Sequence, residues 1–298
     1  MKILITGATG NVGIAVIKSL SKTQHTLQVV AGVKDLESDK EKLADYKVGF
    51  VAFDFMDAAT YRPALKGCQM LFLLRPPQIS DTEKYFKPLV EMAKEAAIKH
   101  IVFLSVQGVE KSTIIPHHKI EKLIVDSKVP YTFLRPAYFM QNFLGSLKHD
   151  LVVNKRVFLP AGNAKFTVVD VRDVGEVAAE IITNPTKHLK KAYELTNHEK
   201  LTFGEMAAQL SEGLGKKITY ESPNLLKFYW TKRKEKVPFV FIMVMIMLHY
   251  LPRFQKTPNI SNAIKEITGK EPATFKQFII DHKPCLKPPS FSPLFCTG

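Results

Sequence analysis

Three glycines, spaced three residues apart, follow the first apolar segment of the chain. That segment, residues 2–6, predicts a β-strand, and residues 12–22 after the glycines predict a helix. In such a unit the first glycine permits a tight turn, the second lets the backbone approach a pyrophosphate, and the third allows close helix–strand packing. The helix N-terminus adds free N–H groups and a positive dipole. The predicted dinucleotide-binding turn comprises Gly7, Thr9, Gly10, Asn11, Val12 and Gly13.

Short apolar runs alternate with helical patterns over the first 136 residues. The apolar runs have no polar face, as expected for a parallel sheet covered on both sides. Strands are predicted at residues 2–6, 27–33, 49–53, 70–74, 101–106 and 131–134, and helices at 12–22, 58–65, 82–99 and 117–127. Strand alternating with helix favours right-handed βαβ units. The fold class is therefore α/β, with a doubly wound parallel Rossmann sheet.

Beyond Pro136 the pattern changes to brief strands among helices. These strands are predicted at residues 157–160, 166–169, 192–196 and 218–222. Capping boxes at Thr202-x-x-Glu205 and Thr274-x-x-Gln277 mark two helix starts. We expect a Rossmann domain at 1–136, a smaller C-terminal α+β substrate or partner domain at 137–282, and a Pro/Lys-rich tail at 283–298. The part of the chain beyond residue 136 is long enough to return to the first sheet.

The net charge of +14 favours anionic partners, which include cofactor phosphates, nucleic acid and acidic lipid surfaces. The lysines are scattered and no helix-turn-helix or aromatic–basic array is evident, so we expect no nucleic-acid partner. Cys68, Cys285 and Cys296 lack metal-ligand spacing, and we expect no metal site. Few cysteines and no evident signal peptide indicate a reducing, cytoplasmic location.

One apolar run invites a membrane interpretation. Residues 237–248 include no polar side chain, but a membrane span needs about 20 apolar residues. We therefore expect no transmembrane span. A buried helix is favoured, in which the methionines fill gaps in the core. The alternative is the wall of a pocket for a flat, apolar substrate.

The residue after the second predicted strand indicates which dinucleotide is bound. An acidic residue at this point holds the ribose 2′-OH of NAD, whereas a cation suits the 2′-phosphate of NADP. Lys34 stands there and favours NADP(H); the adjacent Asp35 would favour NAD(H) if the register differs by one residue. Asp54 follows the third strand, where contacts to the adenine edge are common.

Several motifs together resemble the NmrA-like family of atypical short-chain dehydrogenases/reductases, in particular its NAD(P)H:quinone oxidoreductase-like members. These are the glycine turn, Asp54-x-x-Asp57, the run at 130–136, Asn142 and the segment 267–278. The resemblance covers about residues 1–280 and implies a Rossmann domain that binds NADP(H), closed by a small C-terminal domain. Members include quinone oxidoreductases, reductases of plant phenolics and redox sensors that regulate a partner.

Ordinary short-chain dehydrogenases use a Tyr-x-x-x-Lys pair for proton transfer, and none follows the fifth strand here. In the family pattern, the position of the lysine falls at His117, which we take as the best proton donor; a solvent-facing residue is the alternative. Ser105 would touch nicotinamide or substrate, unless the backbone satisfies its hydroxyl. We expect Leu74, Arg75 and Pro76 to abut the cofactor, with a surface ion pair as the alternative for Arg75.

These features favour an NADPH-dependent reductase of quinones or related carbonyl compounds, with a small apolar or aromatic substrate. Hydride would pass to a substrate held between Ser105, His117 and the pair Tyr138 and Phe139. We also expect Ser105, Tyr138 and Phe139 to contact the cofactor. The rival hypothesis is a non-enzymatic NADP(H) redox sensor that regulates a protein partner, because the tyrosine–lysine pair is missing.

Overall fold

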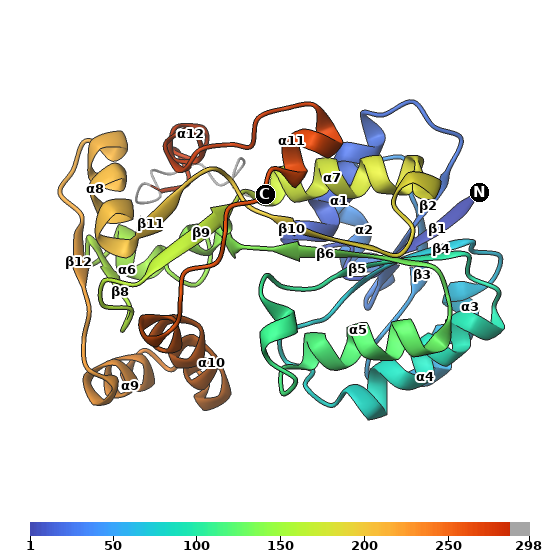
Figure 1. Ribbon diagram of the computed structural model, residues 1–298, viewed down its shortest axis with the longest axis horizontal. Helices are drawn as coiled ribbons and strands as arrows, with labels where there is room; N and C mark the ends of the chain where they lie inside the picture. Colours follow the sequence, from blue (N-terminus) through green and yellow to red (C-terminus); the bar gives the residue numbers. More distant parts are fainter. Residues whose placement is uncertain (287–298) are drawn as a thin grey trace.

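Seven parallel strands form the central sheet of the computed structural model, which describes residues 1–286 (Figure 1). In spatial order they are β10 (Lys191–Leu195), β6 (Tyr131–Pro136), β5 (His100–Leu104), β4 (Met70–Leu74), β1 (Lys2–Ile5), β2 (Gln28–Val33) and β3 (Gly49–Ala52). The order reverses between β1 and β4. In sheets of this kind, ligands bind outside the carboxyl ends of the strands at that switch point. The predicted α/β doubly wound Rossmann class is confirmed.

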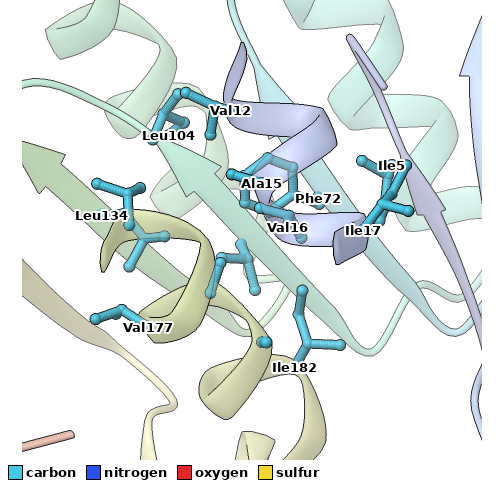
Figure 2. Close-up of a cluster of buried hydrophobic side chains, with 14 of the residues drawn as sticks. Ile5, Val12, Ala15, Val16, Ile17, Phe72, Leu104, Leu134, Val177 and Ile182 are labelled. Carbon is cyan, nitrogen blue, oxygen red and sulfur yellow. The ribbon is translucent and has the colours of Figure 1, made fainter. Parts of the chain in front are cut away.

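Helices cover both faces of this sheet (Figure 1). On one face lie α1 (Asn11–Ser21), α7 (Val171–Thr183) and α11 (Ala263–Thr268); on the other lie α3 (Tyr61–Leu65), α4 (Thr82–Glu95) and α5 (Pro116–Ser127). Figure 2 shows side chains of α1 and α7 packed over Phe72 and Leu134 of the sheet. A Cβ on Gly175 would lie 2.6 Å from the backbone of Ala15, so α7 crosses α1 at a separation that only glycine permits.

After residue 136 the chain leaves the sheet and comes back to it. Strand β10 pairs in parallel with β6, and α7 and α11 pack in the same core as α1. The Rossmann body therefore includes segments from beyond the first 136 residues. Strand β10 is contributed by residues that lie between two parts of the smaller body in sequence.

The smaller body combines short strands with helices, as predicted. Its sheets are β11 (Lys200–Thr202), β9 (Lys165–Val169) and β7 (Tyr138–Phe139), and β12 (Thr219–Glu221) with β8 (Arg156–Phe158). Its helices are α6 (Lys148–Val152), α8 (Phe203–Leu214), α9 (Leu225–Lys234), α10 (Phe239–Tyr250) and α12 (Phe275–Asp281). Phe143, Phe158, Phe203 and Phe275 are fully buried in a separate core.

Helix starts depend on side-chain caps that the sequence partly anticipates. Thr202 and Glu205 form the complete capping box of α8. Thr274 accepts a hydrogen bond from the Gln277 N–H, but the Gln277 side chain turns to Asp281 instead of closing the second predicted box. Helix α2 (Leu36–Lys42) was not predicted. From position 287 onward, the predicted tail lies outside the described residues. Cys296 belongs to this part of the chain.

Helix α10 is mostly exposed, so the expectation of a buried helix is wrong. Only Ile242, Met245 and His249 are buried, along a single stripe. Phe239 and Val240 are 54% and 68% exposed, because the smaller body packs against one side of the helix only. Within residues 1–286, no helix combines the length and the apolar character needed to cross a bilayer.

Candidate functional site

The glycine turn between β1 and α1 is packed too tightly for side chains at two of its three positions. Gly7 has a φ of +58°, and a Cβ there would lie 2.7 Å from a methyl group of Leu74 across the switch point. A Cβ on Gly13 would lie 2.2 Å from the Gly7 carbonyl oxygen. A Cβ on Gly10 would meet only that same oxygen, at 3.4 Å. Internal packing therefore explains Gly7 and Gly13, whereas Gly10 leaves space for a ligand beside the backbone.

The first turn of α1 has no side-chain cap. Gly10 is the N-cap residue, and the Ile14 N–H donates to its carbonyl oxygen at 2.9 Å. Val12 is 8% exposed with its side chain in the core, so it can offer a ligand only its backbone N–H. Thr9 and Asn11 flank the cap, and the Asn11 side chain is exposed. An uncapped helix N-terminus of this kind is suited to a phosphate group.

The charged residues that follow β2 and β3 are held by an ion pair and by a helix cap. Lys34 Nζ lies 2.8 Å from Asp54 Oδ2, and this contact raises the pKa of Lys34. Asp54 also accepts from the Met56 N–H; although partial burial acts to raise its pKa, these bonds hold it below the usual value. Asp35 caps α2 by accepting from the N–H groups of residues 37 and 38. Both of these bonds go to Oδ1 of the exposed Asp35 carboxylate.

Arg75 follows β4 and is held by main-chain carbonyl groups. Its Nη1 donates to the carbonyl oxygens of Pro76, Pro77 and Ile79 at 3.1, 3.2 and 2.7 Å. Burial lowers the pKa of this guanidinium. Among residues 1–286 it forms no ion pair with a carboxylate, so the alternative of a surface ion pair is wrong. The arrangement leaves a partly desolvated cation without a counter-charge beside the switch point.

His117, in the first turn of α5, faces inward, so the solvent-facing alternative is wrong. Its Nε2 accepts a 3.5 Å hydrogen bond from Arg75 Nε. The centroid of its ring lies 6.2 Å from the centroid of the Phe103 ring. Burial first, and then the charge of Arg75, lower the pKa of His117 to about 3. Both effects disfavour the protonated imidazole that a proton donor at this position would need. A neutral ring that accepts at Nε2 bears its proton on Nδ1.

Ser105 directly follows β5 at the same edge of the sheet. Its side chain is 2% exposed, and its N–H donates to the Leu134 carbonyl at 2.7 Å. Its buried Oγ has no hydrogen-bond partner within residues 1–286, so the alternative of a hydroxyl satisfied by the backbone is wrong. Because an unpaired buried hydroxyl costs free energy, this oxygen is suited to a ligand group.

Tyr138 and Phe139 lie where the chain passes from one body to the other. Phe139 packs against the Rossmann core, and Tyr138 packs against the core of the smaller body. The Tyr138 hydroxyl lies 3.1 Å from Nε2 of His249, and His249 Nδ1 lies 2.6 Å from the Met245 carbonyl oxygen. Since a carbonyl only accepts, Nδ1 donates to it and Tyr138 donates to Nε2. Sequence reasoning missed His249, whose only signal was its place directly after the apolar run of α10.

Acidification should destabilise the fold through its buried histidines. Burial lowers the pKa of His100, His117 and His249 to about 4, 3 and 4, from an ordinary value of 6.5. The unfolded chain then binds more protons between about pH 6.5 and pH 4, so the free energy of unfolding falls as pH drops through that window. Asp173, whose pKa burial raises to about 7, opposes part of this trend. Urea titrations across this range test the prediction.

The test variant is His249→Asn, which removes a buried histidine, and the control is His198→Asn. His198 is exposed and forms an ion pair with Glu271. His249→Asn should flatten the pH dependence of the unfolding free energy, and His198→Asn should leave it close to that of the parent chain. An unfolding free energy that rises on acidification from about pH 6.5 would contradict the argument.

Comparison with known proteins places this arrangement in a family. The model of the NmrA-like family matches residues 1–270. The chain belongs to the NmrA-like family. A curated relative is Prestalk A differentiation protein A of Dictyostelium discoideum, 30% identical over 279 residues that cover 93% of this chain and 91% of that protein.

A second relative in this comparison is quinone oxidoreductase 2 of Escherichia coli strain K12. It is 30% identical over 227 residues, which cover 74% of this chain and 77% of that protein. The crystal structure of the Escherichia coli NADPH-dependent quinone oxidoreductase complexed with NADPH matches this fold with a TM-score of 0.80. That match has 25% identity and covers 94% of this chain and 99% of that one. The predicted resemblance to the quinone oxidoreductase-like members is thereby confirmed.

Proposed function

We propose that this NmrA-like protein is an NADPH-dependent reductase. The observation that carries the proposal is the glycine turn, where the uncapped start of α1 and the space beside Gly10 fit a pyrophosphate. The Asn11, Val12 and Gly13 N–H groups would hold the phosphate oxygens. The relative crystallised with NADPH, whose fold this chain shares, supports the choice of dinucleotide.

The cation and the hydroxyl at the ends of β4 and β5 fit the remainder of a dinucleotide. Arg75 lacks a counter-charge within the described chain and would hold a phosphate oxygen or a ribose hydroxyl. The buried Ser105 Oγ would gain the partner that residues 1–286 do not supply, from the nicotinamide amide group or the substrate. Leu74 supports this end of the site by packing against Gly7.

When bound, the reduced nicotinamide supplies a hydride, and one proton completes the reduction of a quinone to a hydroquinone. His117 is neutral at physiological pH, because its pKa is about 3. We infer that His117 orients the substrate by donating a hydrogen bond to it from Nδ1. The proton that completes the reduction would come from solvent. The missing tyrosine–lysine pair is compatible with this reaction, since a quinone needs no strong acid on the protein.

Quinones or related carbonyl compounds are the proposed substrates. The name of the Escherichia coli relative supports a quinone. Tyr138 and Phe139 place aromatic rings where the two bodies meet, and Tyr138 packs edge-on with Phe203 and His249 at ring-centroid distances of 5.6 Å. Such rings suit a flat, apolar substrate.

A quinone panel with the purified protein tests the reaction. We expect NADPH oxidation that depends on both protein and quinone, with cofactor binding measured separately by thermal stabilisation. Binding of NADPH without turnover on any quinone or carbonyl compound would overturn the reductase proposal. A partner protein captured only in the presence of NADP(H) would then support the redox-sensor hypothesis.

Lys34→Ala tests the choice between NADPH and NADH. We expect the affinity for NADPH to fall severalfold and that for NADH to change little, because only NADPH carries the 2′-phosphate that the Lys34 ammonium would contact. Thermal shifts with each cofactor measure this difference. The control is Lys42→Ala, which removes an equally charged residue whose ammonium lies 2.8 Å from Asp39 on α2. Equal losses for both cofactors in Lys34→Ala would contradict the assignment.

A further inference from the structure

The exposed side of α10 and its neighbours form an apolar surface that the proposed function does not use. We call it the α9–α10 apolar face and define it by Trp230, Phe239, Val240, Met243, Met247 and Phe254. The exposed fraction of each side chain lies between 44% and 71%. Exposed apolar patches of this extent on a folded protein mark interaction sites.

Ring contacts link α10 to the segments on either side of it. Trp230 packs against Tyr229 at 5.3 Å, and Tyr229 against Phe239 at 6.3 Å, which links α9 to the start of α10. At the other end of α10, Tyr250 packs 5.4 Å from Phe254. Figure 1 shows α9 and α10 together at one side of the smaller body. The buried stripe of α10 faces the core, so the exposed arc is a second side that the fold does not use.

Exposed cations on α9, directly after it and after α10 flank the α9–α10 apolar face in sequence, and we call them its cationic rim. Residues 222–261 contain seven Lys or Arg residues and one carboxylate, Glu235. That carboxylate is engaged at 2.8 Å by Lys232, the one buried cation of the seven. The other six are exposed and have no ion-pair partner within residues 1–286: Lys227, Arg233, Lys234, Lys236, Arg253 and Lys256.

We propose that the α9–α10 apolar face docks this protein on the surface of an anionic lipid bilayer. A helix that lies flat in the interface combines Trp, Phe and aliphatic side chains with flanking Lys and Arg, as this segment does. The 12 residues of α10 make it about 18 Å long, which suits a helix lying along the interface rather than across it. Anionic headgroups supply the charges that the six cations lack.

A second copy of the chain is a poorer occupant for this face. A two-fold dimer places the same patch on both sides of the interface, so it would bring two rims of unpaired cations together. The cost of that like-charge contact rises at low salt, whereas attraction to anionic lipid also rises at low salt. The two occupants therefore differ in the sign of their salt dependence.

Trp230 gives the test a built-in probe, because it is the only tryptophan of the chain and is 61% exposed. The full-length protein is mixed with vesicles of phosphatidylcholine, with or without phosphatidylglycerol. We expect a blue shift of the emission and co-sedimentation with the phosphatidylglycerol vesicles only, both reduced by added salt. No shift and no co-sedimentation with these vesicles would overturn the proposal.

Two sets of variants separate the contributions of the apolar side chains and of the cations to vesicle binding. Phe239→Ser with Met243→Ser should weaken vesicle binding about tenfold, and Arg233→Gln with Lys234→Gln and Lys236→Gln should remove the preference for anionic lipid. Ile114→Ser, at a side chain 82% exposed on the other body, is the matched control and should bind like the parent chain. Unchanged thermal stabilisation by NADPH verifies that each variant is folded. A concentration-dependent dimer that Phe239→Ser disrupts, without vesicle binding by the parent chain, would overturn the proposal in favour of a second copy.

Discussion

Gly13→Ala is expected to abolish cofactor binding and to lower the stability of the whole Rossmann body. The added Cβ would lie 2.2 Å from the Gly7 carbonyl oxygen and 2.7 Å from the Ala8 Cα, so α1 must move away from the strand it follows. Overpacking of this severity costs about 3 kcal/mol. We expect that loss in urea unfolding, together with the loss of thermal stabilisation by NADPH.

Two further glycines serve as controls for this experiment. Gly204→Ala, in the first turn of α8, adds a Cβ whose nearest neighbours are 3.7 Å away, and it should leave stability and binding unchanged. Gly10→Ala adds one whose nearest neighbour is 3.4 Å away, so the fold should survive while the backbone can no longer approach a pyrophosphate. NADPH binding by Gly10→Ala equal to that of the parent chain would rule out the assigned position of the pyrophosphate.

Arg75→Met should weaken NADPH binding by about tenfold to a hundredfold, the range expected for a hydrogen bond to a charged group. The reason is that Arg75 is the partly buried cation at the end of β4 that lacks a carboxylate partner within residues 1–286. Methionine keeps most of the side-chain volume but removes the charge. Calorimetric titration with NADPH measures the change directly.

The control for Arg75→Met is Arg62→Met, which breaks an exposed pair with Glu95 at 2.7 Å and lies on α3. This variant loses the same charge, so it corrects for the long-range field of a chain with a net charge of +14. Both variants should weaken binding equally if Arg75 acts only through that field, and such a result would refute the proposed contact.

The central strands were predictable because burial on both faces leaves continuous apolar runs in the sequence. Strand β4 matches its predicted bounds, Met70–Leu74, and the other five predicted strands of the sheet are displaced by no more than two residues at either end. Helix α2 was missed because its sequence, LESDKEK, has no apolar periodicity; the Asp35 cap marks its start. The exposure of α10 was also unpredictable, because an apolar run indicates burial unless the surface available to cover it is known.

In the candidate site, too, the contacts between residues close in sequence were predictable, and those between distant residues were not. Gly7, Gly10 and Gly13 act within one turn, so their spacing between a predicted strand and a predicted helix was enough to predict the dinucleotide site. Arg75 and His117 are 42 residues apart, and their contact depends on how β4 and α5 pack. The pKa of His117 follows from that packing, and a residue type alone cannot reveal it. Tyr138 and His249 are 111 residues apart and joined for the same reason.

The position of β10 has a consequence for biosynthesis. Strand β6 is complete at Pro136, but its outer neighbour β10 begins only at Lys191, after α6, β8, β9 and α7. While the chain emerges from the ribosome, β6 is therefore a bare sheet edge with unpaired N–H and C=O groups, a template for intermolecular pairing. Nascent chains that pause between these two strands are the ones most exposed to aggregation, and chaperone capture would protect them there.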